Sequence, residues 1–68
     1  MAMEKQITNA FSNSRKLKGV VPNDQQVQNV ITRLSQIFTD EELQNMEEKV
    51  FIRQVERVWP VAQYVDRD

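Results

Sequence analysis

The chain has 68 residues, of which 28% are charged and 40% hydrophobic, and it contains one glycine, two prolines and neither cysteine nor histidine. This length predicts a single small domain over residues 1–68. The composition excludes disulfide scaffolds and the usual zinc sites, so we expect self-association or a partner to supply extra stability. No secretory signal or membrane-spanning run is present, which predicts a cytoplasmic protein that does not bind membranes. The size and economy are typical of bacterial or phage proteins.

Charge is distributed unevenly along the chain. The net charge is −1, but residues 1–34 hold five Lys or Arg and two Asp or Glu, whereas residues 35–68 hold four and eight. Such a chain can pair head to tail with a second copy. It suits nucleic acid poorly as a whole, because carboxylates oppose the cations that would contact phosphate.

The first predicted helix covers about residues 3–18. Its apolar positions recur at helical spacing and are Met3, Ile7, Ala10, Phe11 and Leu17. Weak helix formers follow from Ser12 to Ser14, so we expect this helix to fray or break near Ser12. Gly19 and Pro22 then mark a connection to the next helix.

The second predicted helix covers about residues 24–38, with Asn23 or Asp24 as its N-cap. Its apolar positions form one narrow stripe, about 120° wide at 100° per residue. They are Val27, Val30, Ile31, Leu34, Ile37 and Phe38. This helix is therefore expected to pack against one neighbour through a single face.

The third predicted helix covers about residues 40–59. Thr39 and Glu42 have the spacing of a capping box, and Pro60 is expected to end the helix at Trp59. Apolar residues cover about 240° of this helix, so it must contact more than one neighbour. They are Leu43, Met46, Val50, Phe51, Ile52, Val55, Val58 and Trp59.

These segments predict an all-α fold, a small three-helix arrangement around the third helix with a short C-terminal tail. An alternative leaves half of the third helix free as an interface with another chain. The tail is expected either to fold back, so that Tyr64 closes the core, or to be presented to a partner.

The sequence offers few residues that could carry out catalysis. His and Cys are absent, and the serines therefore lack a histidine to activate them. One glycine cannot build a phosphate-binding loop, and the acidic residues lack the spacing of a calcium loop. We expect no enzymatic activity, no cofactor, no metal and no small-molecule substrate.

The leading hypothesis is a protein–protein interaction module that acts as an inhibitor, adaptor or assembly factor. It would dock the spare apolar face of the third helix on a larger protein, because aromatic residues near a chain end are typical of interfaces. The predicted anchors are Phe51, Ile52, Val55, Trp59 and Tyr64. Arg53 and Arg57 would set the orientation by charge at the rim.

Two alternative functions are also compatible with the sequence. A small dimeric DNA-binding regulator would place Arg15, Lys16 and Lys18 on phosphates and use Gln25 and Gln26 to read bases. The opposing carboxylates make nucleic acid the less favoured partner. The other alternative is a structural subunit of a homo-oligomeric assembly, a dimer or larger.

Overall fold

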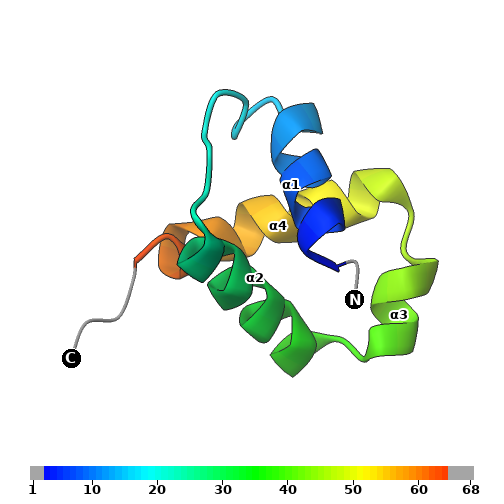
Figure 1. Cartoon of the computed structure of the whole chain (residues 1–68). Coiled ribbons are helices and arrows are strands. Elements are labelled where there is room, and N and C mark those ends of the chain that lie inside the picture. Colours follow the sequence, from blue (N-terminus) through cyan, green and yellow to red (C-terminus); the bar gives the residue numbers. More distant parts are fainter. Residues whose placement is uncertain (1–2, 65–68) are drawn as a thin grey trace.

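The computed structural model describes residues 3–64, and within this range the secondary structure is entirely helical. The helices are α1 (Met3–Asn13), α2 (Asp24–Ile37), α3 (Asp40–Asn45) and α4 (Glu48–Ala62). The predicted all-α fold is confirmed. Three long helices and one short helix pack together, and α3 is the short one (Figure 1).

The predicted caps are present at two helix starts. Asn23 Oδ1 accepts a hydrogen bond from the Gln26 amide, and the Gln26 side chain accepts one from the Asn23 amide, at 2.8 and 2.9 Å. Thr39 and Glu42 form the same reciprocal pair at the start of α3. Each box satisfies two amides that a helix start leaves without intrahelical partners.

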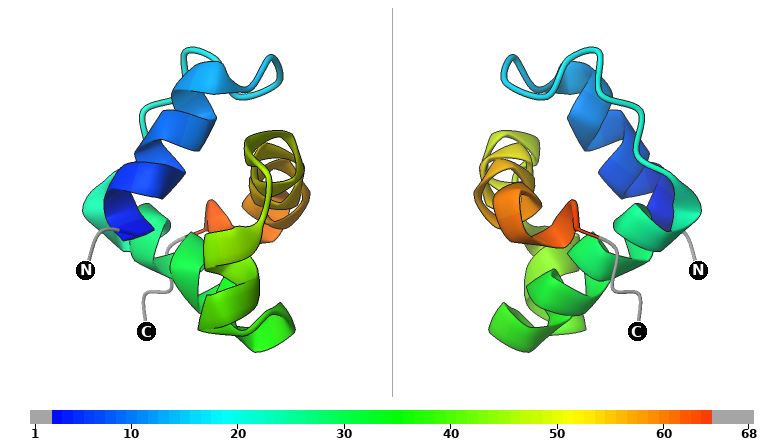
Figure 2. Two further views of the ribbon diagram at one scale, coloured as in Figure 1. Left: turned by 90° about the vertical axis from the view of Figure 1, so that its right-hand side faces the viewer. Right: turned by 90° about the vertical axis from the view of Figure 1, so that its left-hand side faces the viewer.

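Helix α4 is the centre of the fold. It packs against both α1 and α2, which also contact each other, so it has the two neighbours that its apolar surface predicts. The side views show α1 and α2 covering different sides of α4 (Figure 2). The buried apolar side chains are Ile7, Ala10, Phe11, Leu17, Val27, Val30, Leu34, Leu43, Phe51, Val55, Val58 and Ala62.

An aromatic contact fixes α1 against α4. The rings of Phe11 and Trp59 meet edge to face, with centroids 4.8 Å apart and planes at 87°. Such pairs contribute about 0.5–1.5 kcal/mol beyond the burial of their area. Trp59 therefore turns toward α1 and is half-buried there.

The first helix is shorter than residues 3–18. It ends at Asn13, which confirms the predicted break near Ser12, and residues 15–19 form turns. The buried Ser14 hydroxyl accepts a hydrogen bond from the Leu17 amide at 3.2 Å and donates one to Glu56 of α4. These bonds replace the next helical turn, and Leu17 still reaches the core.

The prediction of one helix over residues 40–59 is wrong in two respects. Met46 and Glu47 are extended, with ψ of 138° and 151°, so the segment is divided into α3 and α4. Because of this break, Leu43 and Phe51 reach the core from two separate helices. The wide apolar arc predicted for a single helix is therefore shared between α3 and α4. Val50 belongs to that arc by sequence but remains 41% exposed.

The second error concerns Pro60, which lies inside α4 because the helix continues to Ala62. A proline removes its own N–H from the helical ladder and crowds the carbonyl four residues earlier, and here it lies within the last turn of the helix. Val58 and Ala62 on either side are buried, and packing of these residues keeps the segment helical. Tertiary packing here outweighs the local preference of the residue before proline for an extended backbone.

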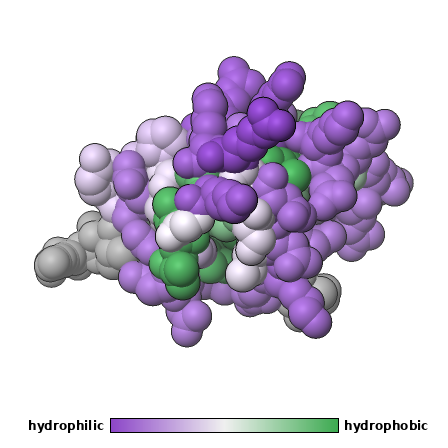
Figure 3. All heavy atoms as spheres, turned by 90° about the horizontal axis from the view of Figure 1, so that it is seen from above, coloured by the Kyte–Doolittle hydropathy of each residue, from purple (hydrophilic) through white to green (hydrophobic). Residues whose placement is uncertain are grey.

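The surface is mainly hydrophilic when viewed from the side on which the α1–α2 connection lies, with a small hydrophobic group among the polar side chains (Figure 3). None of the helices within residues 3–64 is long and apolar enough to cross a membrane.

Candidate functional site

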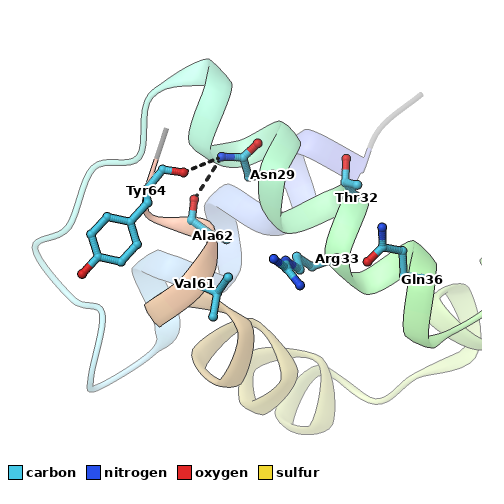
Figure 4. Close-up of a pocket in the computed structure, with 7 residues that line it drawn as sticks. All are labelled: Asn29, Thr32, Arg33, Gln36, Val61, Ala62 and Tyr64. Atoms are coloured by element: carbon cyan, nitrogen blue, oxygen red, sulfur yellow. Dashed lines mark hydrogen bonds between the residues drawn. The ribbon is translucent and has the colours of Figure 1, made fainter. Parts of the chain in front are cut away.

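The groove between α2 and α4 is the strongest candidate site. It consists of two adjoining hollows, of about 400 and 490 Å³, which share Arg33 and Val61. The first is lined by Arg33, Ile37, Phe38, Gln54, Arg57, Val58 and Val61. The second is lined by Asn29, Thr32, Arg33, Gln36, Val61, Ala62 and Tyr64 (Figure 4). We refer to both together as the α2–α4 groove.

Two rows of side chains form the walls of the α2–α4 groove. Asn29, Arg33 and Ile37 recur every four residues on α2 and therefore share one side of that helix. Gln54, Arg57 and Val61 form the corresponding row on α4, at spacings of three and four. Packing of the buried faces of α2 and α4 holds the two rows opposite each other.

Exposed apolar side chains distinguish this groove. Ile37, Val61 and Tyr64 are 60%, 52% and 73% exposed. Half of the exposed large hydrophobic residues within residues 3–64 therefore lie on this one surface; the others are Val20, Val21 and Val50. Grouping of apolar residues beside polar ones is typical of interaction surfaces, whereas single exposed residues are ordinary.

The charged side chains that line the α2–α4 groove are all positive among the residues that the structure describes. Arg33 and Arg57 are exposed, and no Asp or Glu within residues 3–64 lines the groove. The three other main hollows among the described residues each include a carboxylate: Glu48 in one, Asp40 in another, and Glu4 with Asp24 in the third. The groove therefore combines apolar contact area with exposed cations and suits an acidic ligand that also carries apolar groups.

Amide side chains of α2 secure one end of the groove. Asn29 Nδ2 donates hydrogen bonds to the carbonyl oxygens of Ala62 and Tyr64, at 3.2 and 3.1 Å (Figure 4). Gln26 Nε2 donates one to the Gln63 carbonyl at 2.9 Å. The last carbonyls of a helix lack intrahelical donors, so these amides cap α4 and determine where Tyr64 leaves it.

The predicted partner-binding residues are divided between the core and the surface. Phe51 and Val55 are buried, and Ile52 and Trp59 are half-buried against the core. These four side chains hold the helices together in this structure. A hollow between α1, α3 and α4 reaches Phe51 and Ile52, but its rim includes Glu48 and its volume is only about 240 Å³.

The other three predicted partner-binding residues lie at the surface. Arg57 and Tyr64 line the α2–α4 groove, from α4 and from the segment that follows it. Arg53 is exposed and is not among the groove residues. The structure thus brings two of the seven predicted residues together, with new neighbours from α2.

The residues of the DNA-binding alternative lie around the α1–α2 connection. Arg15, Lys16 and Lys18 are exposed there. Gln25 is exposed and donates to Asn29 Oδ1 at 3.2 Å. Gln26 is engaged at both ends of its amide, in the capping box and with Gln63, so base reading would require it to give up these bonds.

Residues 3–64 contain no group of three acidic, His or Cys side chains arranged to hold a metal ion. The Ser14 hydroxyl donates a hydrogen bond to Glu56 of α4 in a partly buried contact. The residues that the sequence analysis missed are Arg33, Ile37 and Val61. Ile37 stood in the predicted apolar stripe, and only the position of α4 shows that it remains outside the core.

No protein family, no curated protein and no solved structure matches this chain.

Proposed function

We propose that this protein is a protein–protein interaction module that binds an acidic segment carrying apolar side chains in the α2–α4 groove. One observation carries the proposal: exposed Ile37, Val61 and Tyr64 share a surface with two arginines, and no carboxylate from residues 3–64 lines that surface. The proposed site keeps Arg57 and Tyr64 from the sequence-based hypothesis and replaces its buried anchors.

Binding would depend on the burial of apolar area, and the charge of the groove would select an acidic ligand. An amphipathic helix or turn would place its apolar side chains against Ile37, Val61 and Tyr64, which provide affinity. Arg33 and Arg57 would pair with carboxylates on the same segment and exclude basic competitors. Because α2 and α4 already pack against each other, binding would require no folding of this protein.

A selection from random peptides tests this function and does not require an identified partner. The full chain would be immobilised, displayed amphipathic peptides would be selected for binding, and the selected peptides would be synthesised for titration. We expect sequences rich in Asp and Glu with interspersed Leu, Ile or Phe. Amide shifts on titration should concentrate at residues 29–37 and 54–64.

Matched variants decide whether the arginines recognise the peptide. Arg33→Glu/Arg57→Glu should weaken binding at least about tenfold, because attraction becomes repulsion at two positions. Arg15→Glu/Lys16→Glu makes the same change in net charge at the α1–α2 connection and should leave affinity unchanged. Selection of neutral or basic peptides, or equal losses in both variants, would contradict the proposal.

A further inference from the structure

The exposed side of α4 extends beyond the α2–α4 groove toward the other end of the helix. Val50, Gln54, Arg57 and Val61 are spaced four, three and four residues apart, so they lie along one side of α4. Gln54, Arg57 and Val61 line the groove, and Val50 continues the row toward the start of α4. One continuous row therefore runs from the cationic groove to the α3–α4 junction.

Carboxylates gather at this junction. Residues 40–48 contain five acidic side chains and no Lys or Arg. They are Asp40, Glu41, Glu42, Glu47 and Glu48, and all five are exposed. The row on α4 thus has an apolar valine near each end. Arg33 and Arg57 lie toward the Val61 end, and the five carboxylates lie toward the Val50 end, where Lys49 and Arg53 are also exposed.

We infer that a second copy of this chain occupies the α2–α4 groove, in a two-fold dimer whose exposed α4 rows run antiparallel. The inference rests on the proposed function, since the second copy supplies the acidic, apolar-bearing segment that the groove suits. Antiparallel pairing places Val50 of one copy near Val61 of the other. It also brings the acidic junction of each copy to the groove of its mate.

Symmetry favours this arrangement over the alternatives. A two-fold axis forms the groove–junction contact twice, so two modest attractions act together. Parallel pairing of the rows would set Arg57 directly against Arg57 and carboxylates against carboxylates, whereas the antiparallel register that pairs Val50 with Val61 sets Arg57 against Gln54 of the mate and keeps the two acidic junctions apart. Head-to-tail pairing would leave one groove and one junction unpaired at the ends of each chain of subunits.

A charge-exchange experiment tests the dimer. Arg33→Glu/Arg57→Glu makes the groove acidic, and Glu41→Lys/Glu47→Lys makes the junction basic. The second variant spares Glu42, which belongs to a capping box, and Glu48, which accepts a hydrogen bond from Asn13. Sedimentation equilibrium of the full chain over a range of concentrations should show a dimer for the natural sequence.

Each variant alone should dimerise at least about tenfold more weakly, because like charges then face each other at both contacts. An equimolar mixture should recover mixed dimers of nearly natural affinity, since a mixed dimer has opposite charges at both contacts. Unfolding cannot imitate this result, because two unfolded variants would not restore each other. Arg15→Glu/Lys16→Glu is the matched control and should dimerise normally.

Three results would overturn the inference. The natural chain could remain monomeric at all concentrations, its dimer could be indifferent to both charge variants, or the mixture could stay monomeric. None of these depends on whether the groove selects acidic peptides. A monomer that still selects such peptides would retain the proposed function and reject the second copy as occupant.

Discussion

Ser14 shows how one small polar residue connects three segments. Its side chain is almost fully buried, accepts from the Leu17 amide and donates to Glu56 of α4. Leu17 is thereby held in the core although α1 has already ended. Buried polar groups that are fully hydrogen-bonded specify a fold well, and the loss of one partner leaves the others unsatisfied.

Ser14→Ala should lower the free energy of unfolding by about 1–3 kcal/mol, because the Glu56 carboxylate loses a donor and the Leu17 amide loses its acceptor. Urea denaturation followed by circular dichroism measures the effect. Ser12→Ala is the matched control, since Ser12 is exposed on α1, and it should change stability by less than about 0.5 kcal/mol. Equal denaturation midpoints for the two variants would contradict the structural role of Ser14.

Glu4 is a second residue whose environment has a measurable consequence. Hydrogen bonds from its own backbone amide and from Gln28 Nε2, the latter at 3.0 Å, lower the pKa of Glu4 below its ordinary value. Because the folded pKa lies below the unfolded one, the ionised carboxylate stabilises the fold above the unfolded pKa. This contribution is lost as the pH falls through the folded pKa.

Gln28→Ala should raise the pKa of Glu4 part of the way to its ordinary value, since the larger contribution from the backbone amide remains. An NMR titration of the side-chain carboxyl carbon reads this pKa directly. Gln25→Ala is the control, because Gln25 bonds Asn29 instead. An unchanged Glu4 pKa in Gln28→Ala would show that the α1–α2 hydrogen bond is not formed in solution.

At the scale of elements, the C-terminal end of α4 depends on side chains from α2. Asn29 and Gln26 donate to three successive carbonyls, those of Ala62, Gln63 and Tyr64. The carbonyls of Trp59, Pro60 and Val61 accept hydrogen bonds from Gln63 and Tyr64, whereas those that follow depend on the amides of α2. The position of Tyr64 at the end of the α2–α4 groove therefore depends on these hydrogen bonds.

Asn29→Ala should loosen the end of α4 without unfolding the protein. We expect the Gln63 amide, which donates to the Trp59 carbonyl at 2.8 Å, to exchange about five- to tenfold faster with solvent. Hydrogen exchange followed by NMR makes the measurement. Thr32→Ala, on the same helix, should leave this exchange rate unaltered, and an equal rate in Asn29→Ala would contradict the capping role.

At the scale of the whole molecule, the core and the proposed interface lie on different sides of α4. Trp59 is about 200° around the helix from both Arg57 and Val61 at 100° per residue. Its ring packs on Phe11 of α1, away from the exposed row. A small protein with one central helix can therefore use that helix both for its own core and for a partner.

Trp59 emission should be the same in the monomer and in the dimer, because self-association through the α2–α4 groove does not change its surroundings. Fluorescence read on the samples used for sedimentation tests this directly. Tyr64→Ser, a change at the groove, should weaken association and leave Trp59 emission unaltered. A red shift of Trp59 emission on dilution would instead place Trp59 in the interface, as the sequence-based hypothesis has it.

The sequence by itself determined the helical class, an N-cap at Asn23 or Asp24, the capping box at Thr39, and the break near Ser12. These features depend on neighbours a few residues apart, through hydrogen bonds of short side chains and through helical periodicity. The same local information predicted that the wide apolar surface of residues 40–59 contacts more than one neighbouring element. It could not divide that segment into α3 and α4, because periodicity assumes one straight axis.

Only the tertiary structure decided which apolar side chains remain exposed. Ile37 and Phe51 are both apolar residues at helical spacing, yet Ile37 is 60% exposed and Phe51 is buried. The difference arises from where α1 and α2 cross α4, and this depends on contacts between residues far apart in the chain. For the same reason Arg33 and Arg57 meet on one groove, since helix packing alone brings positions 24 residues apart to a common surface.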